Sequence, residues 1–402
     1  MIKRFNLSAI NSTLFILWTS HFIMDFFKGI WPIYKTISKM DLAQAGLIAG
    51  ISGFFGEILQ LLFGYFCDQG YRKKILLLGL VLSSSILWIT FSNSFFFSLI
   101  IVLILMIGSG SFHPAAVGYA GALSSEHKGK NILIFSSGGA LGLGISQIVF
   151  TKMYYAFNGH TLILFLPIAL LFIFILIHKF PEIDTGSLRI HASQLTESLS
   201  KHVKPLTLLY FTQVSSYLVG SALLFLLPDV MMAKTANQWL TMGGGHLCFI
   251  MGAAFSLPWV GFLCDRLGPK KILPVFILAP LALLYLLLKK SHFSTTEAIA
   301  LLVFLGGFFQ SISPIIISWG HKMMPTIPST VSAILMGLAW CVTNFGPTCA
   351  GLMCKRFEED AVIQALEWMG LLMVISLFLS LCIKDTIPAE KTSNTAELDP
   401  EF

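Results

Sequence analysis

The sequence predicts an all-α integral membrane protein with twelve transmembrane helices in two pseudo-symmetric six-helix bundles. Of its 402 residues, 55% are hydrophobic and only 11% are charged, whereas a soluble domain carries about 25% charged residues. Apolar runs of the length that crosses a bilayer, about 20 residues, recur along the whole chain. Motifs in the first half of the chain also return in the second half. Composition, run length and internal repeat therefore predict the same fold.

Twelve apolar runs are candidate membrane spans, and short linkers join most of them. The exception is the polar, Ser-rich segment 179–204, which separates two sets of six runs. We expect an N-terminal bundle at 1–178, a cytoplasmic linker at 179–204, a C-terminal bundle at 205–384 and a disordered cytoplasmic tail at 385–402. The expected spans are 9–34, 43–66, 74–92, 96–121, 131–154, 161–178, 205–228, 240–263, 272–289, 297–319, 330–354 and 362–384.

Lysine and arginine are unevenly distributed among the linkers. Most of the 26 Lys and Arg residues lie in segments on the same side as the N-terminus, which predicts that both termini are cytoplasmic. The net charge of +6 is then loop charge, because no soluble basic domain is visible that would bind nucleic acid. The first apolar run is too long for a cleavable signal peptide.

Two motif pairs recur at an offset of roughly 200 residues, which indicates a duplicated bundle. GYFCDQGYRKK (64–74) follows the second run, and GFLCDRLGPKK (261–271) follows the eighth. SHFIMDFFKGIWP (20–32) in the first run corresponds to SYLVGSALLFLLP (216–228) in the seventh. Duplicated bundles are typical of transporters, whose substrate site lies between the halves near the membrane midplane.

The repeated loop motif places an aspartate, glycines and basic residues at the cytoplasmic end of a helix pair. Glycine lets helices approach closely, and the aspartate can accept hydrogen bonds from a neighbouring helix N-terminus. If the aspartate bonds across the halves only when the outward side is open, it acts as a conformational latch. Positive-inside topology alone would explain the basic residues but not the repeated aspartate. The expected latch residues are Gly64, Asp68, Arg72, Gly261, Asp265 and Arg266.

This loop pattern resembles the signature of the major facilitator superfamily, and the resemblance covers nearly the whole chain. The second copy fits the pattern, whereas in the first copy Gln69 replaces the usual arginine and Gly70 comes one residue early. The resemblance implies the major facilitator fold.

Two further segments resemble a particular group of that superfamily, the fosmidomycin resistance proteins. These segments are 20–32 and GSGSFHPAAVGYA (108–120), and the group carries a similar H-F-x2-D helix and an F-H-P segment. The resemblance implies a proton-driven exporter of small molecules in the bacterial inner membrane, without fixing the substrate.

Three titratable residues lie inside the first apolar run. His21, Asp25 and Lys28 are spaced i, i+4, i+7, so they share one stripe of a helix. Each charge costs about 2.5–3.5 kcal/mol at mid-membrane, so the stripe should face a central cavity and pair internally. Asp25 can pair with Lys28 or with His21, and a carboxylate beside an imidazole can exchange a proton near neutral pH. A permanent ion pair that only aligns helices is the alternative, and Lys28 can instead bind an anionic substrate group or snorkel outward.

Two more candidates lie in the second and fourth runs. Glu57 precedes Asp68 by about 16 Å along a helix axis, which places it near mid-bilayer. It adjoins a glycine-rich face, so it either packs against a helix or faces the cavity. His113 precedes Pro114, and proline tends to kink a helix. His113 can therefore bind substrate, carry a proton or satisfy a freed carbonyl.

The second half carries far fewer titratable residues in its spans, with Ser221 at the position that corresponds to Asp25. This asymmetry predicts that the first half handles protons and the second offers hydrogen bonds and aromatic surface to the substrate. The segments 138–144 (GGALGLG) and 344–347 (NFGP) are expected to bend or to pack closely. The expected cavity residues of the second half are Gln213, Tyr217, Gln310, Ser313, Trp319, Trp340 and Asn344.

Motif searches favour a secondary transporter over other classes. The sequence contains no GxxxxGK[ST] loop for ATP and no HExxH or zinc spacing, so we expect no cofactor, no metal and no enzyme activity. The leading function is proton-coupled efflux (antiport) of a drug or metabolite, and the alternative is proton-coupled uptake or export of a nutrient or siderophore. The expected partners are a small-molecule substrate, protons and the lipid bilayer, with no nucleic acid and a monomeric chain.

Overall fold

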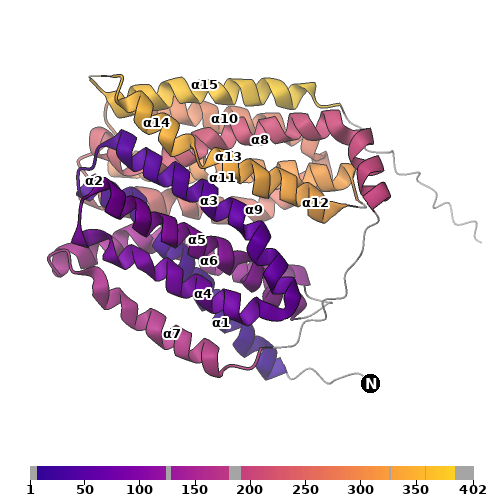
Figure 1. The fold of residues 1–402 in the computed structure, drawn as a ribbon. Coiled ribbons are helices and arrows are strands. Elements are labelled where there is room, and N and C mark those ends of the chain that lie inside the picture. Colours follow the sequence, from indigo (N-terminus) through magenta and orange to yellow (C-terminus); the bar gives the residue numbers. More distant parts are fainter. Residues whose placement is uncertain (1–6, 124–127, 181–191, 326, 358, 385–402) are drawn as a thin grey trace, which may run out of the picture.

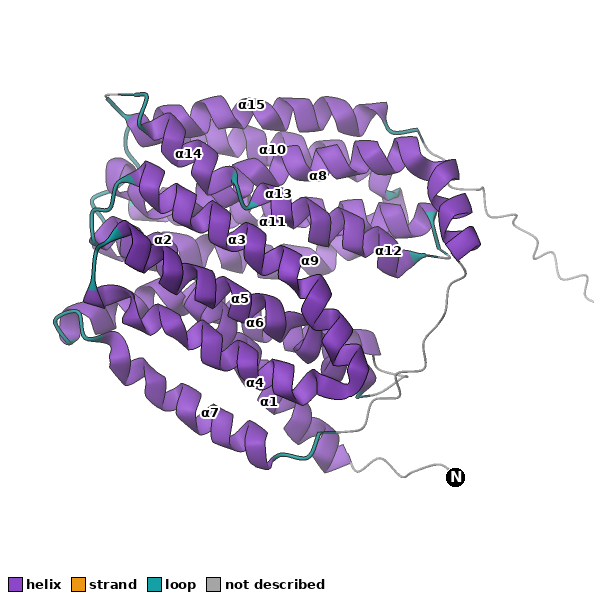
Figure 2. Ribbon diagram, in the orientation of Figure 1, coloured by secondary structure: helices purple, strands orange, loops and turns teal. Residues whose placement is uncertain are grey.

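The computed structural model describes residues 7–123, 128–180, 192–325, 327–357 and 359–384, and every regular element among them is helical (Figure 2). Residues 1–6 of the predicted N-terminal bundle, residues 181–191 of the predicted linker and the predicted tail at 385–402 lie outside the described residues. The helix α8 begins at Ala192, so the second half of that linker is helical and continuous with the seventh span.

Ten helical elements form the six spans of the first half. The elements outnumber the spans because a glycine or a short turn divides several spans into two elements. These elements are α1 (Leu7–Lys28), α2 (Ile30–Ile37), α3 (Leu42–Phe66), η1 (Cys67–Tyr71), α4 (Arg72–Ser83), η2 (Ser84–Phe91), α5 (Phe95–Ala122), α6 (Lys128–Ala156), η3 (Thr161–Leu164) and α7 (Phe165–Ile177).

Ten further elements form the six spans of the second half, with the eleventh span divided into four pieces. These elements are α8 (Ala192–Lys234), η4 (Leu240–Gly244), α9 (Gly245–Leu267), α10 (Pro269–Lys289), α11 (Thr295–Met323), α12 (Pro328–Ser332), η5 (Ala333–Leu338), α13 (Ala339–Thr343), α14 (Gly346–Cys354) and α15 (Ala361–Cys382).

The helices account for all twelve expected spans. Nine described stretches are long and apolar enough to cross a bilayer, and one of them, the 50-residue stretch Leu42–Phe91, contains two spans. The α1–α2 pair and the shorter Thr161–Ile177 complete the set. The predicted all-α membrane fold of two six-helix bundles is therefore confirmed.

The two halves lie side by side and meet most closely at one end. We call the end that carries α2 and α14 the α2 side, and the opposite end the α12 side. Helices of the two halves converge near α2 and α14 and spread apart toward α12 (Figure 1). On the α2 side, the buried Lys35 ammonium of α2 pairs with the Asp229 carboxylate of α8, and the Thr348 hydroxyl donates to the Gly46 carbonyl at 2.8 Å. The α2 side is thus closed in this conformation.

Glycines allow α3 and α14 to touch across the halves. A Cβ atom on Gly46 would lie 2.3 Å from the Pro347 carbonyl oxygen, and one on Gly351 would lie 2.1 Å from that of Leu42. Both neighbours are backbone atoms, which cannot move away as a flexible side chain can. Close helix contact through small residues is a common way of packing in membranes.

We predict that Gly46→Ala weakens this closure. Overpacking costs about 1–3 kcal/mol, so the population with an open α2 side should rise by roughly one order of magnitude. The measurement is labelling of the buried native thiol of Cys354 by an impermeant maleimide added on the α2 side. Gly337→Ala is the matched control, because nothing lies within 4 Å of a Cβ atom built there. Equal labelling of the two variants would contradict the role of Gly46.

Candidate functional site

A cavity of about 520 Å³ lies between the halves near the middle of the spans. All five titratable residues expected in the first half line it: His21, Asp25 and Lys28 from α1, Glu57 from α3 and His113 from α5. The other lining residues are Gln60, Pro114, Val117, Phe135, Ser136, Met336 and Trp340. Since residues of both halves form its wall, the cavity lies where an alternating-access carrier would hold its substrate.

Asp25 is the centre of a cluster with two histidines. Its Oδ2 atom lies 3.2 Å from Nε2 of His21, one helical turn away. Its Oδ1 atom lies 3.7 Å from Nε2 of His113 and has no hydrogen-bond partner among the described residues. The His21 ring also stacks on the Phe135 ring, with 4.2 Å between centroids. The structure therefore pairs Asp25 with His21 rather than with Lys28, and it brings in a second histidine from α5.

Backbone carbonyls determine which ring nitrogens carry hydrogen. Nδ1 of His21 lies 2.9 Å from the Phe135 carbonyl oxygen, and Nδ1 of His113 lies 2.8 Å from that of Ser109. A carbonyl only accepts, so each Nδ1 is assigned as an N–H donor. If both rings are neutral, both Nε2 atoms then direct lone pairs at the Asp25 carboxylate. Acceptors would face acceptors, and one additional proton, on Asp25 or on the His21 ring, would turn the closer contact, that of 3.2 Å, into a hydrogen bond.

His113 does not satisfy the carbonyl that Pro114 leaves free. Proline at position 114 removes the hydrogen bond to the carbonyl four residues earlier, that of Gly110, whereas the His113 ring bonds the Ser109 carbonyl. The Ser109 hydroxyl also lies 3.3 Å from the same nitrogen. The ring is thus fixed at one nitrogen and presents the other to Asp25.

Glycines of α6 allow this helix to pack closely against α1 at the cluster. A Cβ atom on Gly139 would lie 2.4 Å from Nε2 of His21 and 2.5 Å from Oδ2 of Asp25, and one on Gly142 would lie 2.0 Å from the Phe22 carbonyl oxygen. The expected close packing of segment 138–144 is therefore present.

We predict that Gly139→Ala lowers proton-driven transport about tenfold by pushing His21 and Asp25 apart, a displacement that typically costs 1–3 kcal/mol. The matched control is Gly144→Ala, whose Cβ atom would meet only flexible side-chain atoms at 3.2 Å or more. The measurement is the initial rate of transport in proteoliposomes with an imposed pH gradient. A rate equal to that of the control would mean that the cluster tolerates displacement.

Lys28 and Glu57 add a basic and an acidic side chain to the same wall. The Lys28 ammonium makes no ion pair within 4.0 Å among the described residues, and it faces the cavity. Glu57 accepts a hydrogen bond from the side-chain amide of Gln60, one turn further along α3. Gln60 was missed from the sequence, although its i+3 spacing from Glu57 was a usable signal.

The second half contributes Trp340 and Met336 to the cavity wall. The other expected residues lie elsewhere in this conformation. The Gln213 side-chain amide donates to Ser313 at 2.8 Å, and the Tyr217 hydroxyl donates to the Gln310 carbonyl at 3.2 Å. These bonds form a buried polar cluster between α8 and α11. Trp319 of α11 is also fully buried. Asn344 packs against Gly53 of α3 at the interface between the halves. As substrate contacts, all of them remain predictions.

The expected latch residues lie at the α12 side and pair within their own halves. Asp68 accepts from Arg72 at 3.2 Å, and Asp265 lies 3.3 Å from Lys322. Both aspartate side chains are largely exposed, at 71% and 81%. The Arg266 guanidinium lies over the Phe262 ring of its own helix, α9. A latch across the halves is therefore not engaged when the α2 side is closed.

The glycine of each loop motif adopts a turn conformation, although Gly70 comes one residue early in the first motif. Gly70 and Gly268 have φ angles of +89° and +82°, a region that favours glycine. Gly64 and Gly261 are not in close contact here: a Cβ atom on Gly64 would meet only Pro114 at 3.9 Å, and one on Gly261 would meet nothing within 4 Å. Their expected role in close helix approach stays a prediction for another conformation.

The Asp25 cluster is also the one group of the described residues whose ligand atoms could hold a metal ion. One ligand atom from each of His21, Asp25 and His113 lies within 4.8 Å of the others. Two imidazole nitrogens and a carboxylate suit a divalent transition metal. The sequence predicts no metal, and a chelator distinguishes the two occupants in the experiment given below.

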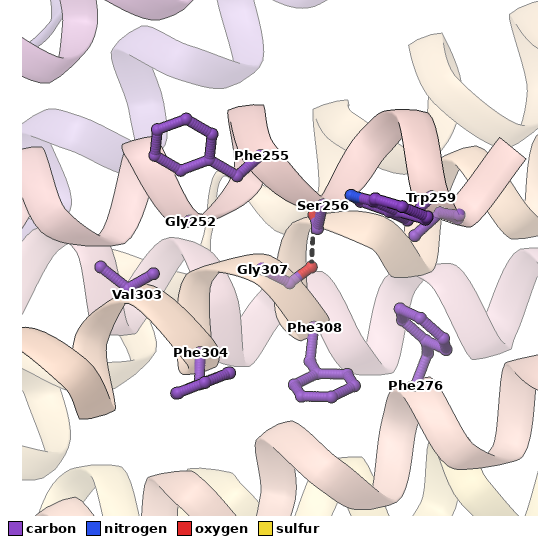
Figure 3. Close-up of a pocket in the computed structure, with 10 residues that line it drawn as sticks. Gly252, Phe255, Ser256, Trp259, Phe276, Val303, Phe304, Gly307 and Phe308 are labelled. Carbon is purple, nitrogen blue, oxygen red and sulfur yellow. Dashed lines mark hydrogen bonds between the residues drawn. The ribbon is translucent and has the colours of Figure 1, made fainter.

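A second cavity, of about 330 Å³, is apolar and carries no titratable group. It lies between α9, α10 and α11 and is lined mainly by aromatic side chains, among them Phe255, Trp259 and Phe304 (Figure 3). These three side chains are at least 60% exposed, as expected for a surface that lipid covers. The hydroxyl of Ser256 donates to the Gly307 carbonyl at 2.9 Å, so the only hydroxyl among the lining residues already has a partner.

Comparison with known proteins assigns the family. The model of the Major Facilitator Superfamily matches residues 13–228 and 206–401. The chain belongs to this superfamily. It is therefore a multi-pass membrane carrier of a small-molecule substrate, driven as a secondary transporter and not an enzyme.

Curated relatives cover almost the whole chain at low identity. The fosmidomycin resistance protein of Escherichia coli (strain K12) is 21% identical over 376 residues, with 90% of each chain covered. The uncharacterized MFS-type transporter YfnC of Bacillus subtilis (strain 168) is 21% identical over 387 residues, covering 91% of this chain and 92% of its own. The resemblance to the fosmidomycin resistance protein group is thus confirmed.

Solved structures of other carriers share the fold. A bacterial homolog of the human lysosomal transporter Spinster, in an inward-facing and unoccupied conformation, aligns with a TM-score of 0.72 at 14% identity, covering 95% of this chain and 97% of its own. The nucleoside transporter NupG aligns with a TM-score of 0.75 at 12% identity, covering 92% of this chain and 99% of its own.

Proposed function

We propose that this chain is a proton-coupled exporter that exchanges external protons for a small molecule, a drug or a metabolite. It would act as a monomer in the bacterial inner membrane, with both termini in the cytoplasm. The α12 side then faces the cytoplasm, and the boundaries proposed for its two bundles are 1–178 and 205–384. The single observation that carries the proposal is the Asp25 cluster, in which the contact between the carboxylate and Nε2 of His21 becomes a hydrogen bond only when one proton is added to the neutral ring and the carboxylate.

Proton and substrate would alternate at this cluster. When the α2 side is open, Asp25 takes a proton from outside, and its neutral form costs less to carry through the closed states than a charge does. In the conformation described here, the cavity serves the cytoplasmic side, where the proton leaves. The wall that remains carries the basic Lys28, the acidic Glu57 and the aromatic Trp340. A polar substrate with an apolar or aromatic portion would bind to that combination.

The direction of transport rests on the E. coli relative. The name fosmidomycin resistance protein supports export, because resistance follows when a carrier removes a toxic compound from the cell. The alternative is proton-coupled uptake or export of a nutrient or siderophore, for which the same proton site would serve.

The test is a transport assay in proteoliposomes with an imposed pH gradient and a panel of compounds that begins with fosmidomycin. We expect substrate to move against the direction of proton flow and an uncoupler to abolish the movement. Co-directional movement of substrate and protons would establish the symport alternative, and no dependence on pH would refute proton coupling. A chelator should leave the rate unchanged, and a loss of transport would assign the Asp25 cluster to a metal instead.

A further inference from the structure

Polar side chains are buried without partners where α6 of the first half meets α9 of the second. Gln147 on α6 is fully buried, and neither its amide nitrogen nor its oxygen has a hydrogen-bond partner among the described residues. The same holds for the Thr151 hydroxyl, one turn further along α6. On α9, His246 is 3% exposed. The Leu143 carbonyl lies close to its ring, but neither ring nitrogen makes a hydrogen bond of normal geometry within the described part of the chain.

The two helices are pressed together at this interface, which we call the α6–α9 seam. Gly243 precedes α9 with a φ of +113°, and a Cβ atom there would lie 2.6 Å from the Ile148 nitrogen and 2.7 Å from Cβ of Gln147. The backbone at Gly243 is therefore in direct contact with α6 beside Gln147. Unpartnered polar groups lose their hydration here without gaining a hydrogen bond, so they oppose the closed state instead of stabilising it.

The seam joins the α2-side surface to the Asp25 cluster. At its outer end, a cavity of about 590 Å³ is lined by Thr151, Lys152 and Gln238. At its inner end, Gly139 lies against His21 and Asp25. Positions 139, 143, 147 and 151 follow one another at i+4 spacing along a slowly winding stripe of α6, and at 1.5 Å per residue they span about 18 Å.

We propose that the α6–α9 seam is the path by which water and protons from the α2 side reach Asp25, closed in this conformation and open to water once α6 and α9 separate. This inference rests on the proposed function and adds the route that the proton takes. Because the path is closed while the cavity serves the opposite side, protons cannot cross unless the carrier changes conformation. Gln147 and Thr151 would bind water in the open path, and His246 would take up and release protons along it.

Several other titratable groups lie on the elements that pack around the seam. They bear on any protonation of His246, since each can exchange protons or place charge near the path. These groups are Lys152 and Tyr155 on α6, Cys248 on α9, His21, Asp25 and Lys28 on α1, His113 on α5, and the paired Lys35 and Asp229 on α2 and α8.

The first test compares two buried glutamines. Gln147→Leu replaces an unpartnered amide by an apolar side chain, so it should raise the melting temperature of the purified protein and lower proton-driven transport at least fivefold. Gln213→Leu is the matched control for stability, because Gln213 is equally buried but donates to Ser313, and its loss should lower the melting temperature. A lower melting temperature with undiminished transport for Gln147→Leu would overturn the proposal.

The second test follows the opening of the seam directly. In His246→Cys, an impermeant maleimide added on the α2 side should label residue 246 at least tenfold faster when Lys35→Met is also present, because that change releases the α2 side. Equal, slow labelling in both backgrounds would overturn the proposal. Labelling needs no substrate, so it reports on the seam even if proton-coupled transport is disproved.

The third test separates the route from the proton site. His246→Phe, and the smaller His246→Asn as a check on folding, should lower proton-driven transport at least tenfold while substrate exchange at equal pH continues. If His246 variants transport normally while an Asp25 variant does not, proton coupling stands and the seam is not its route.

Discussion

Asp25→Asn is expected to abolish proton-driven transport while leaving substrate exchange intact. Asparagine keeps the size of the side chain but cannot take up a proton, so the cluster with His21 and His113 loses the group through which the gradient acts. Removing a positioned proton-transfer group typically costs 10²–10⁴-fold, and we expect a loss of about 100-fold or more in the initial rate. The measurement compares transport under a pH gradient with exchange of labelled for unlabelled substrate at equal pH on both sides.

Two variants make the Asp25 result specific. Asp25→Glu keeps a carboxyl group and should retain part of the coupled rate, because a longer side chain can still reach Nε2 of His21, now 3.2 Å from Asp25. Glu297→Gln changes a carboxylate that is 52% exposed and pairs with Lys290 outside the cavity, so a pH gradient should still drive transport by this variant. Coupled transport by Asp25→Asn at the normal rate would show that the proton binds elsewhere, and Glu57 would be the next candidate.

The fold could be predicted almost completely from the sequence because the bilayer imposes it. Each span must be long and apolar, and the division at 179–204 is visible as a change of composition. The first-half site was also predictable, since a charge inside an apolar run must face a cavity or a partner. His21, Asp25 and Lys28 follow from spacing on one helix, and Glu57 and His113 meet them because α5 packs against both α1 and α3.

The details that give the site its chemistry were beyond sequence reasoning. The tautomers of His21 and His113 depend on the backbone carbonyls of Phe135 and Ser109. Every residue has a backbone carbonyl, so the sequence does not show which one lies beside a given ring. The cavity residues of the second half were harder still to predict, because neutral polar residues can form hydrogen bonds with each other within a bundle. Gln213 does so with Ser313, and nothing in its spacing separates that outcome from a place in the cavity wall.

The pair of Lys35 and Asp229 was missed for a related reason. Lys35 follows the first apolar run and was counted only as a loop charge for the topology, and Asp229 lies just after the seventh run. Their contact forms only because α2 and α8 of opposite halves converge at the α2 side, where Thr36 also donates to Asp229 at 3.0 Å. The Lys35 side chain is completely buried, which marks this pair as a structural element of the closed side.

Lys35→Met is therefore expected to shift the carrier strongly toward an open α2 side. It leaves the Asp229 carboxylate without its cation in a largely buried position, and breaking one partner of a buried ion pair costs about 3–5 kcal/mol. At 1.4 kcal/mol for each factor of ten, the open population should rise about 100-fold or more. The native thiol of Cys354 reports the change, because it is 7% exposed and lies beside both charges. An impermeant maleimide added on the α2 side should label it correspondingly faster.

A double variant distinguishes the ion pair from mere packing. Lys35→Met with Asp229→Leu removes both charges, and an apolar pair can replace a buried ion pair at little cost. Labelling of Cys354 should then return most of the way to the original rate, although transport should remain slow because the closed α2 side no longer contains a pair that water can separate. If the double variant labels as fast as Lys35→Met alone, the charges do not hold the two halves together, and the closure depends on the glycine contacts of α3 and α14 instead.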